Sequence, residues 1–320
     1  MNARIAWATT VSWLVFVTAG NPTESVFGQE IDAPSPNSVS DESVLEKLQR
    51  AKLEITSDAV HLRYKYKTGE VIRWKVVHLA TTDTTIKKET ETSKTRSVAV
   101  KAWKVIAADA TGKATLQHIV EEVDMWQKVS SRPEIRYNSR NDETPPPEYF
   151  TVAQTIGVPL LTAQVTSTGQ ITKRDRPKKN FDLGLGQMTI PFPAQPIAPG
   201  KSWYVPSQIA VQLSSGQIRQ LKIRKKYTLE HVKTGVATIR VRTERITPVN
   251  DPRIEAQLMQ DLVDGVIRFD LDAGRMISRQ VDWDETVIEF AGASSMIKYR
   301  ARLTETLIPQ TTHTADASGS

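Results

Sequence analysis

Apolar and polar positions alternate with a period of two along most of the chain after Leu62. In the segment VIRWKVVHL, for example, Ile72, Trp74 and Val76 are apolar, and the two residues between them are charged. A strand whose apolar residues occupy only the odd or only the even positions (one apolar parity) buries one face. This is typical of antiparallel sheets. The pattern therefore predicts a mainly β protein built from curved antiparallel sheets.

Two short helices are expected within this β framework. Residues 43–54 begin with a capping box at Ser43 and continue with apolar side chains near helical spacing. Residues 252–263 follow Asp251, a favourable N-cap, and begin with Pro252 at the first helical position. We therefore expect a short N-terminal helix and a second short helix near 252–263.

The two halves of the sequence resemble each other. GKATLQHIVEEV begins at Gly112 and GVATIRVRTERI begins at Gly235, and both glycines lie where a hairpin turn is predicted. TGQITKR around Gly169 and AGRMISR around Gly274 repeat a second glycine in the same order. Turn glycines also recur by chance in antiparallel proteins, so coincidence is the alternative to an internal duplication. Both interpretations predict two similar β units.

The sequence divides into six segments. Proline-rich and serine-rich stretches mark the boundaries, because proline interrupts regular strand pairing. The expected organisation is a signal peptide at 1–28, a flexible leader at 29–42, a first β unit with the N-terminal helix at 43–190, a linker at 191–200, a second β unit at 201–308 and a disordered tail at 309–320.

The first residues have the pattern of a secretory signal peptide. Arg4 precedes the apolar run IAWATTVSWLVFV, and small residues follow, so we expect cleavage after Ala19 or after Gly28. The run is shorter than the roughly 20 apolar residues of a membrane span. An uncleaved N-terminal anchor is the alternative. The sequence predicts an exported protein, periplasmic or extracellular, whose mature chain has no transmembrane span.

The chain contains no cysteine. This excludes disulfides, thiolate metal ligands and lipidation of an N-terminal cysteine. An exported protein without disulfides depends on its hydrophobic core for stability. The mature chain is long enough to bury such a core.

A hairpin in the second half carries the most specific surface feature, which we call the basic hairpin. Its cations are Lys222, Arg224, Lys226, Arg240 and Arg242. The opposite parity is apolar and consists of Leu221, Ile223, Tyr227, Leu229, Ala237, Ile239 and Val241. Burying one parity exposes the other, so we expect the five cations to share a solvent-facing side.

The basic hairpin is our candidate site for an anionic partner. A turn centred on Lys233 would place Lys226 opposite Arg240 and Arg224 opposite Arg242. Like charges in such positions destabilise a sheet slightly, which a ligand-binding role would explain. The net charge of +6 fits an anionic polysaccharide or a lipid surface. A solvated face without a ligand accounts for the same residues.

No catalytic or metal-binding motif is present. The spacings of a nucleophile elbow, a zinc helix and a phosphate loop are absent, and the five histidines form no local metal pair. VDWDE places Asp282, Asp284 and Glu285 beside Trp283, a combination that can bind sugars or cleave glycosides. An exposed acidic strand end explains VDWDE equally. We expect no cofactor, no metal ion and no specific nucleic-acid partner.

The segment DPRIEAQLMQDLVDGVIRFDLDAGRMISRQVDWDETVIEF, with the later closing strand, resembles uncharacterised exported β-rich bacterial proteins known only as a domain of unknown function. YKYKTGEVIRW in the first half is also similar to theirs. The resemblance covers residues 62–308, and its motifs are structural. In architecture alone, the pattern is similar to the periplasmic lipoprotein carriers, whose curved half-barrel sheet has helices in its mouth.

Three functions follow from these observations. The first is an exported, non-enzymatic binding or cell-envelope-associated protein of unknown ligand. The second is a carrier of lipid or another apolar molecule in a concave β sheet. The third is a hydrolase whose site is scattered over several strands. An apolar pocket would favour the carrier, and clustered carboxylates with perturbed pKa values would favour the enzyme.

Overall fold

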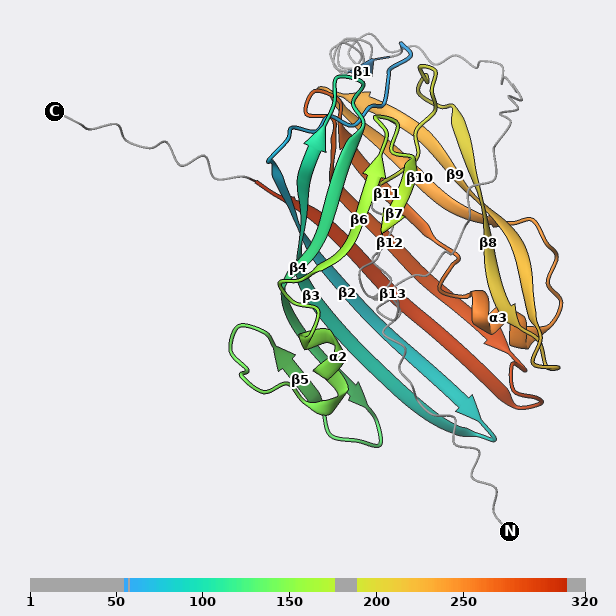
Figure 1. The fold of residues 1–320 in the computed structure, drawn as a ribbon. Helices are drawn as coiled ribbons and strands as arrows, with labels where there is room; N and C mark the ends of the chain where they lie inside the picture. The colour runs from blue at the N-terminus through green and yellow to red at the C-terminus, as the bar shows by residue number, and fades with distance from the viewer. Residues whose placement is uncertain (1–54, 57, 176–188, 310–320) are drawn as a thin grey trace, which may run out of the picture.

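The protein is a mainly β structure organised as one large antiparallel sheet (Figure 1). A computed structural model describes residues 55–56, 58–175 and 189–309. Within this part of the chain all 13 strands join one sheet, and every strand pair of the sheet is antiparallel. The predicted fold class is therefore confirmed. The signal peptide, the leader and the helix at 43–54 lie outside the described residues.

The strands differ greatly in length. They are β1 (Ile55–Thr56), β2 (Val71–Ile86), β3 (Glu89–Ala108), β4 (Ala114–Val129), β5 (Ile135–Asn138), β6 (Pro159–Val165), β7 (Ile171–Asp175), β8 (Ser202–Gln212), β9 (Ile218–Lys233), β10 (Val236–Arg245), β11 (Asp264–Asp270), β12 (Arg275–Ile288) and β13 (Ser295–Ile308). The helical elements are the 3-10 helix η1 (Pro147–Tyr149) and the helices α2 (Phe150–Ala153) and α3 (Pro252–Leu258).

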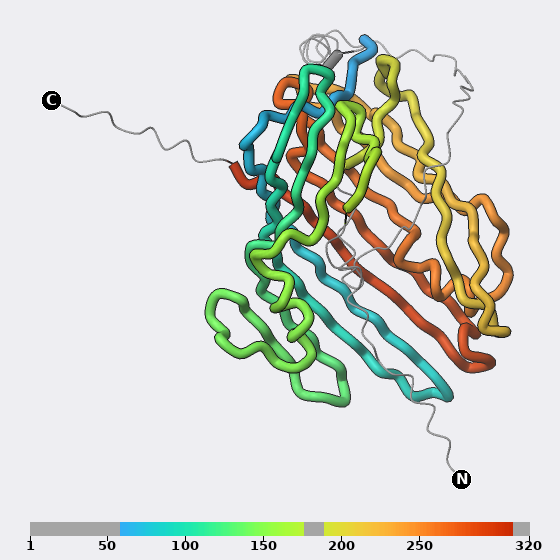
Figure 2. The backbone as a smooth tube through the Cα atoms, in the orientation of Figure 1, coloured from blue at the N-terminus to red at the C-terminus, as the bar shows by residue number. Residues whose placement is uncertain are grey.

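The two halves of the chain meet in the middle of the sheet. The strand order is β1-β9-β10-β11-β12-β13-β2-β3-β4-β6-β7, with β8 paired to β9 and β5 paired to β4. The last strand, β13, pairs with β2 from Ser295 opposite Ile86 to Ile308 opposite Arg73. The ribbon and the backbone tube show that the sheet curls (Figures 1 and 2).

The glycines of the predicted repeat occupy equivalent places. Gly112 and Gly235 lie between β3 and β4 and between β9 and β10, whereas Gly169 and Gly274 lie between β6 and β7 and between β11 and β12. All four have positive φ values, between 61° and 80°. A helix lies between β4 and β6 in one half, after the short strand β5, and another lies between β10 and β11 in the other half. This order is what a duplication requires, and the duplication itself stays a prediction.

These glycine turns all lie at one end of the sheet, which we call the glycine end. Two extended segments cross the sheet there and tie the halves together. The backbone N–H of Tyr64 donates to Ser167 at 2.7 Å, and that of Lys65 donates to Gly274 at 3.0 Å. Phe192 similarly donates to Thr168 at 2.7 Å. The segments that contain Tyr64 and Phe192, which belong to no strand, therefore cover the glycine end of the sheet.

The main core lies on the face of the sheet that these segments cover, called here the inner face. Tyr64, Phe192 and Phe269 form its centre, with ring centroids 4.8 to 5.2 Å apart. The seven apolar residues predicted to be buried in the basic hairpin are all buried. Phe192 and Ile197, within the predicted linker, belong to this core as well. The opposite, solvent-facing side is called the outer face.

Helix α3 begins as predicted and ends earlier. The Asp251 side chain accepts a hydrogen bond from the Arg253 N–H at 2.9 Å, and Pro252 is the first helical residue. The helix ends at Leu258 rather than near 263, because the Val263 carbonyl accepts a hydrogen bond from Thr243 of β10 at 2.8 Å. The chain must already be extended at that point.

The segment 130–150, which is rich in polar residues and contains three successive prolines, includes short regular elements. Strand β5 pairs with β4 from Ile135 to Asn138, and η1 follows the prolines. Tyr137 and Tyr149 are buried there against Val123 and Met125 of β4. The apolar alternation of Ile135 and Tyr137 explains this strand, because it gives the segment one face to bury.

Candidate functional site

The basic hairpin forms as a β9–β10 hairpin, and its five cations share the outer face. Their register differs from the prediction. Arg242 faces Lys226, Arg240 faces Thr228 and Arg224 faces Glu244. The turn is centred between Thr234 and Gly235 rather than on Lys233, and a bulge at Glu230 shifts the pairing beyond it by one residue. The predicted oppositions of Lys226 with Arg240 and of Arg224 with Arg242 are therefore wrong.

Ion pairs neutralise the three arginines of the basic hairpin. Arg224 binds Glu244 at 2.6 Å, and Arg240 binds Glu230 at 2.7 Å and Asp264 at 3.2 Å. Arg242 lies 4.0 Å from Asp264. For Lys222 and Lys226 the described part of the chain provides no acidic partner. The local positive charge is therefore much smaller than the sequence suggests.

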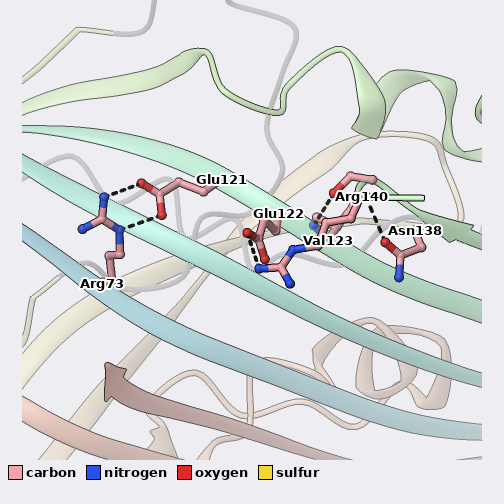
Figure 3. A network of polar contacts seen from close by, with 7 residues as sticks. Arg73, Glu121, Glu122, Val123, Asn138 and Arg140 are labelled. Carbon is pink, nitrogen blue, oxygen red and sulfur yellow. Dashed lines mark hydrogen bonds and ion pairs between the residues drawn. The ribbon is translucent and has the colours of Figure 1, made fainter. Parts of the chain in front are cut away.

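Similar cross-strand ion pairs cover the rest of the outer face. They are Arg96–Asp124, Arg300–Asp83, Arg302–Asp282 and Lys298–Asp284. Strand β4 has a bulge at Glu121, where its pairing with β3 shifts by one residue. Figure 3 shows two more ion pairs beside this bulge: Arg73 binds both carboxylate oxygens of Glu121, at 2.8 and 3.0 Å, and Arg140 binds Glu122 at 2.5 Å. Exposed pairs of this kind are worth at most about 1 kcal/mol each.

A groove of about 1050 Å³ crosses β10, β11, β12 and β13. Arg240 and Arg242 of the basic hairpin line it, together with Asp264 and Asp282. Its lining includes as many carboxylates as arginines, so the groove itself has no preference for anions. It is also polar, unlike the apolar pocket that would favour a carrier.

The residues of VDWDE separate onto two faces. Trp283 is buried on the inner face, where its Nε1 donates to the Gln260 carbonyl at 3.0 Å. Asp282 and Asp284 face outward and pair with Arg302 and Lys298. The ring is thus not available as a sugar platform beside these carboxylates. Among the described residues no group of three or more His, Asp or Glu side chains is placed to hold a metal ion.

Sequence reasoning missed a row of polar side chains on the inner face, which we call the charged belt. It consists of His78 on β2, Lys101 on β3, Lys225 on β9, Asp261 after α3, Arg279 on β12 and Glu305 on β13. All except Asp261 occupy the apolar parity of their strands. Lys101, for example, lies between Ala99 and Trp103, which are both buried. That interruption of an apolar parity was the signal available in the sequence.

The centre of the charged belt is a buried ion pair. Arg279 and Glu305 face each other across β12 and β13, with Nη1 and Oε2 3.5 Å apart, and each residue is 8% exposed. Lys101 lies opposite Trp74 on β2 and is partly exposed. Lys225 and Asp261 are also partly exposed. The belt therefore runs from the buried core to solvent.

Burial governs the protonation of the charged belt. It lowers the pKa of Lys225 to about 8, with nearby Arg279 acting in the same direction. Burial also raises the pKa of Asp261 to about 6, against the attraction of Lys225. It lowers the pKa of Lys101 and that of His78. At neutral pH Lys225 stays largely charged, and His78 is neutral.

Several polar atoms near the belt are buried without a hydrogen-bond partner among the described residues. They are Trp74 Nε1, His78 Nε2 and Arg279 Nε. Because His78 Nε2 is unpaired, no serine or threonine hydroxyl is held against it as a hydrolase would require. A buried donor that lacks an acceptor costs about 1–3 kcal/mol.

Beside the belt, the inner face carries a strip of partly exposed apolar residues, the inner strip. It consists of Ala80, Ile297, Ala301 and Leu303. Ala80 faces Ala301 across β2 and β13, and Trp283 follows on β12. On one flank α2 and β5 cover Ala99 and β4, and on the other α3 covers β8 and β9.

The sequence matches no protein-family model and no curated protein. Two solved structures are similar in part. One, described by its lipid–protein interactions, is lipovitellin, with 14% identity and a TM-score of 0.44 over 80% of this chain. This chain spans 27% of the length of that lipovitellin. The other is a DUF1329 family protein from Desulfovibrio piger, with 9% identity and a TM-score of 0.15. The similarity covers 71% of this chain and 83% of that protein. Both TM-scores are below 0.5.

Proposed function

We propose that the protein is an exported, non-enzymatic binding protein that holds the hydrocarbon part of a lipid-like molecule on the inner face of its sheet. The inner strip carries this proposal. It is apolar and partly exposed, and it lies between two regions of the same face that helices cover. The signal-peptide pattern supports export. The described residues contain no helix that is both long and apolar enough for a membrane span.

Small side chains give the inner strip its shape. Four neighbouring strands, β3, β2, β13 and β12, place the following residues directly opposite one another: Thr95, Ala80, Ala301 and Trp283. Two alanines between larger side chains form a shallow place in the face, into which a methylene chain can pack. Each buried methylene contributes about 0.8 kcal/mol. A chain of several methylenes would therefore bind without any polar contact.

Filling the space above these two alanines should weaken binding. We expect Ala301→Phe to weaken binding of a fluorescent fatty acid by at least about tenfold, because the ring occupies the space of several methylenes. The partly exposed position leaves room for the ring, so the unfolding midpoint should change little. Titration of the purified protein measures the affinity. Ala210→Phe, at an exposed position on β8, is the control and should bind normally.

The same protein, purified from the exported fraction of its host, identifies the natural ligand. Native mass spectrometry should show a bound species whose mass is that of a lipid, on a chain that begins between residues 20 and 30. A protein that carries no bound species and does not bind the fluorescent fatty acid would remove the proposal.

The basic hairpin remains a second proposal, as a site for an anionic polymer. Lys222 and Lys226 support it, because they keep the outer-face charge that the ion pairs remove from the arginines. We expect Lys222→Glu with Lys226→Glu to weaken binding to a sulfated polysaccharide and to flatten its dependence on salt. Lys75→Glu with Lys104→Glu, on the outer face of β2 and β3, is the matched control. Equal binding by both double variants would reduce the basic hairpin to a solvated face.

A further inference from the structure

We infer that the charged belt recognises the anionic head of the ligand whose hydrocarbon part lies on the inner strip. The inference rests on the proposed function and names the ligand class. This class is an amphipathic oxyacid, which carries a carboxylate or a phosphate on a hydrocarbon chain. Lys101 is the contact residue, and Arg279 is the buried charge behind it.

The belt and the inner strip are continuous on the sheet. On β13, Leu303 of the strip is followed at the same face by Glu305 of the belt. Glu305 faces Val76 on β2, and two positions along β2 Trp74 faces Lys101. A ligand lying along the strip therefore brings its end to Lys101.

The belt has more donors than acceptors. Within the described part of the chain, the Nζ of Lys101 makes no hydrogen bond and no ion pair. Trp74 Nε1 and Arg279 Nε are buried donors without an acceptor. The carboxylate of Glu305 is already engaged by Arg279. Because buried donors are almost always satisfied in folded proteins, the arrangement lacks an acceptor, and an oxyanion supplies two or more.

The net charge of the belt also favours an anionic head. Lys101, Lys225 and Arg279 are three cations, and Glu305 and Asp261 are two carboxylates. Asp261 interacts with Lys225 rather than with Lys101, so Glu305 alone offsets the two charges of Lys101 and Arg279. The end of the belt at Lys101 is therefore positive. It adjoins the apolar inner strip, where the lower dielectric constant makes a charge pair stronger than in water. A neutral hydroxyl head can accept a hydrogen bond there, but it gains no charge pair.

The test compares two ligands that differ only in their head. A long-chain fatty acid and the alcohol of the same chain length are titrated into the wild-type protein, Lys101→Met and Lys104→Met. Lys104 lies on the same strand, three residues further, and is exposed on the outer face. We expect the wild type and Lys104→Met to prefer the acid by about tenfold or more, because a charge-assisted hydrogen bond is present only with the acid.

Lys101→Met should bind acid and alcohol equally, with the alcohol affinity unchanged. Lys101→Arg should restore the preference for the acid, which shows that the charge and not the shape of the lysine matters. A lysophosphatidic acid of the same chain length distinguishes the sources of the oxyanion. It should bind more tightly than the fatty acid if the natural head is a phosphate.

Three contrary outcomes are distinguishable. If all variants bind acid and alcohol equally well, the inference about the charged belt is overturned and the proposed function stands. If neither ligand binds the wild type, the proposed function itself fails. A preference for the acid that persists in Lys101→Met would assign the anion to another cation and overturn the role of Lys101.

Discussion

Gly169→Ala should lower the free energy of unfolding by about 3 kcal/mol or more, whereas Gly200→Ala should lower it by only about 1 kcal/mol. Both glycines have φ near +80°, so both alanines pay the same backbone strain. A Cβ at Gly169 would also lie 2.4 Å from the Ile190 carbonyl oxygen and 2.6 Å from the Tyr64 ring, whereas Gly200 has open space. Urea unfolding followed by tryptophan fluorescence measures both losses.

The difference between the two variants is the informative quantity. It isolates the contact between the β6–β7 turn and the segments that close the glycine end, because the strain is common to both. Equal losses of unfolding free energy would show that Tyr64 and Ile190 can move away from the new Cβ without an energetic cost. The glycine end would then not be rigid.

His118→Phe should make the protein more resistant to acid. His118 is fully buried, its ring stacks on Trp103 with centroids 4.4 Å apart, and neither ring nitrogen has a partner among the described residues. Burial, with a smaller contribution from Lys101, lowers its pKa to about 3. The unfolded chain binds the proton near the ordinary pKa of about 6.5.

The direction of the effect follows from these two values. The folded state holds His118 neutral, so its contribution to stability is complete above pH 6.5 and is lost progressively as the pH falls toward 3. At pH 4 the loss amounts to about 3 kcal/mol. His118→Phe keeps the stacking and removes the titration, so the variant should exceed the wild type by about that amount at pH 4.

Urea unfolding at pH 7 and at pH 4 provides the measurement. His61→Gln is the control, because His61 is exposed, and it should follow the wild type at both pH values. A His118→Phe variant that loses stability on acidification as steeply as the wild type would show that His118 is protonated in the folded protein.

The alternation of apolar residues was enough to predict the strands and their buried faces. Tyr227, Leu229 and Ile239 are all buried as the parity requires, since turning such a strand over would bury its cations. Register was not predictable in the same way. The turn is centred between Thr234 and Gly235 rather than on Lys233, and Glu230 is bulged. Together these two features place Arg240 opposite Thr228 instead of Lys226, and both depend on neighbouring strands.

The candidate sites show the same division. The five cations of the basic hairpin were predicted to face outward together, and they do. Their partners come from other strands, for example Asp264 of β11 beside Arg240, and no local pattern shows this. The charged belt left a local trace, because Lys101 and Lys225 interrupt apolar parities. Their convergence with Arg279 and Glu305 depends on the order of the strands.

The position of β13 has a consequence for how the chain folds. Strand β13, the most C-terminal strand of the described residues, lies between β12 and β2, near the centre of the sheet. Until it arrives, β2 and β12 each present a long unpaired edge, and such edges pair readily with other chains. Contacts between residues so distant in sequence also slow folding, because loop closure precedes any gain from pairing. The chain therefore depends on β13 to become a single sheet, and it is most prone to aggregation just before that strand docks.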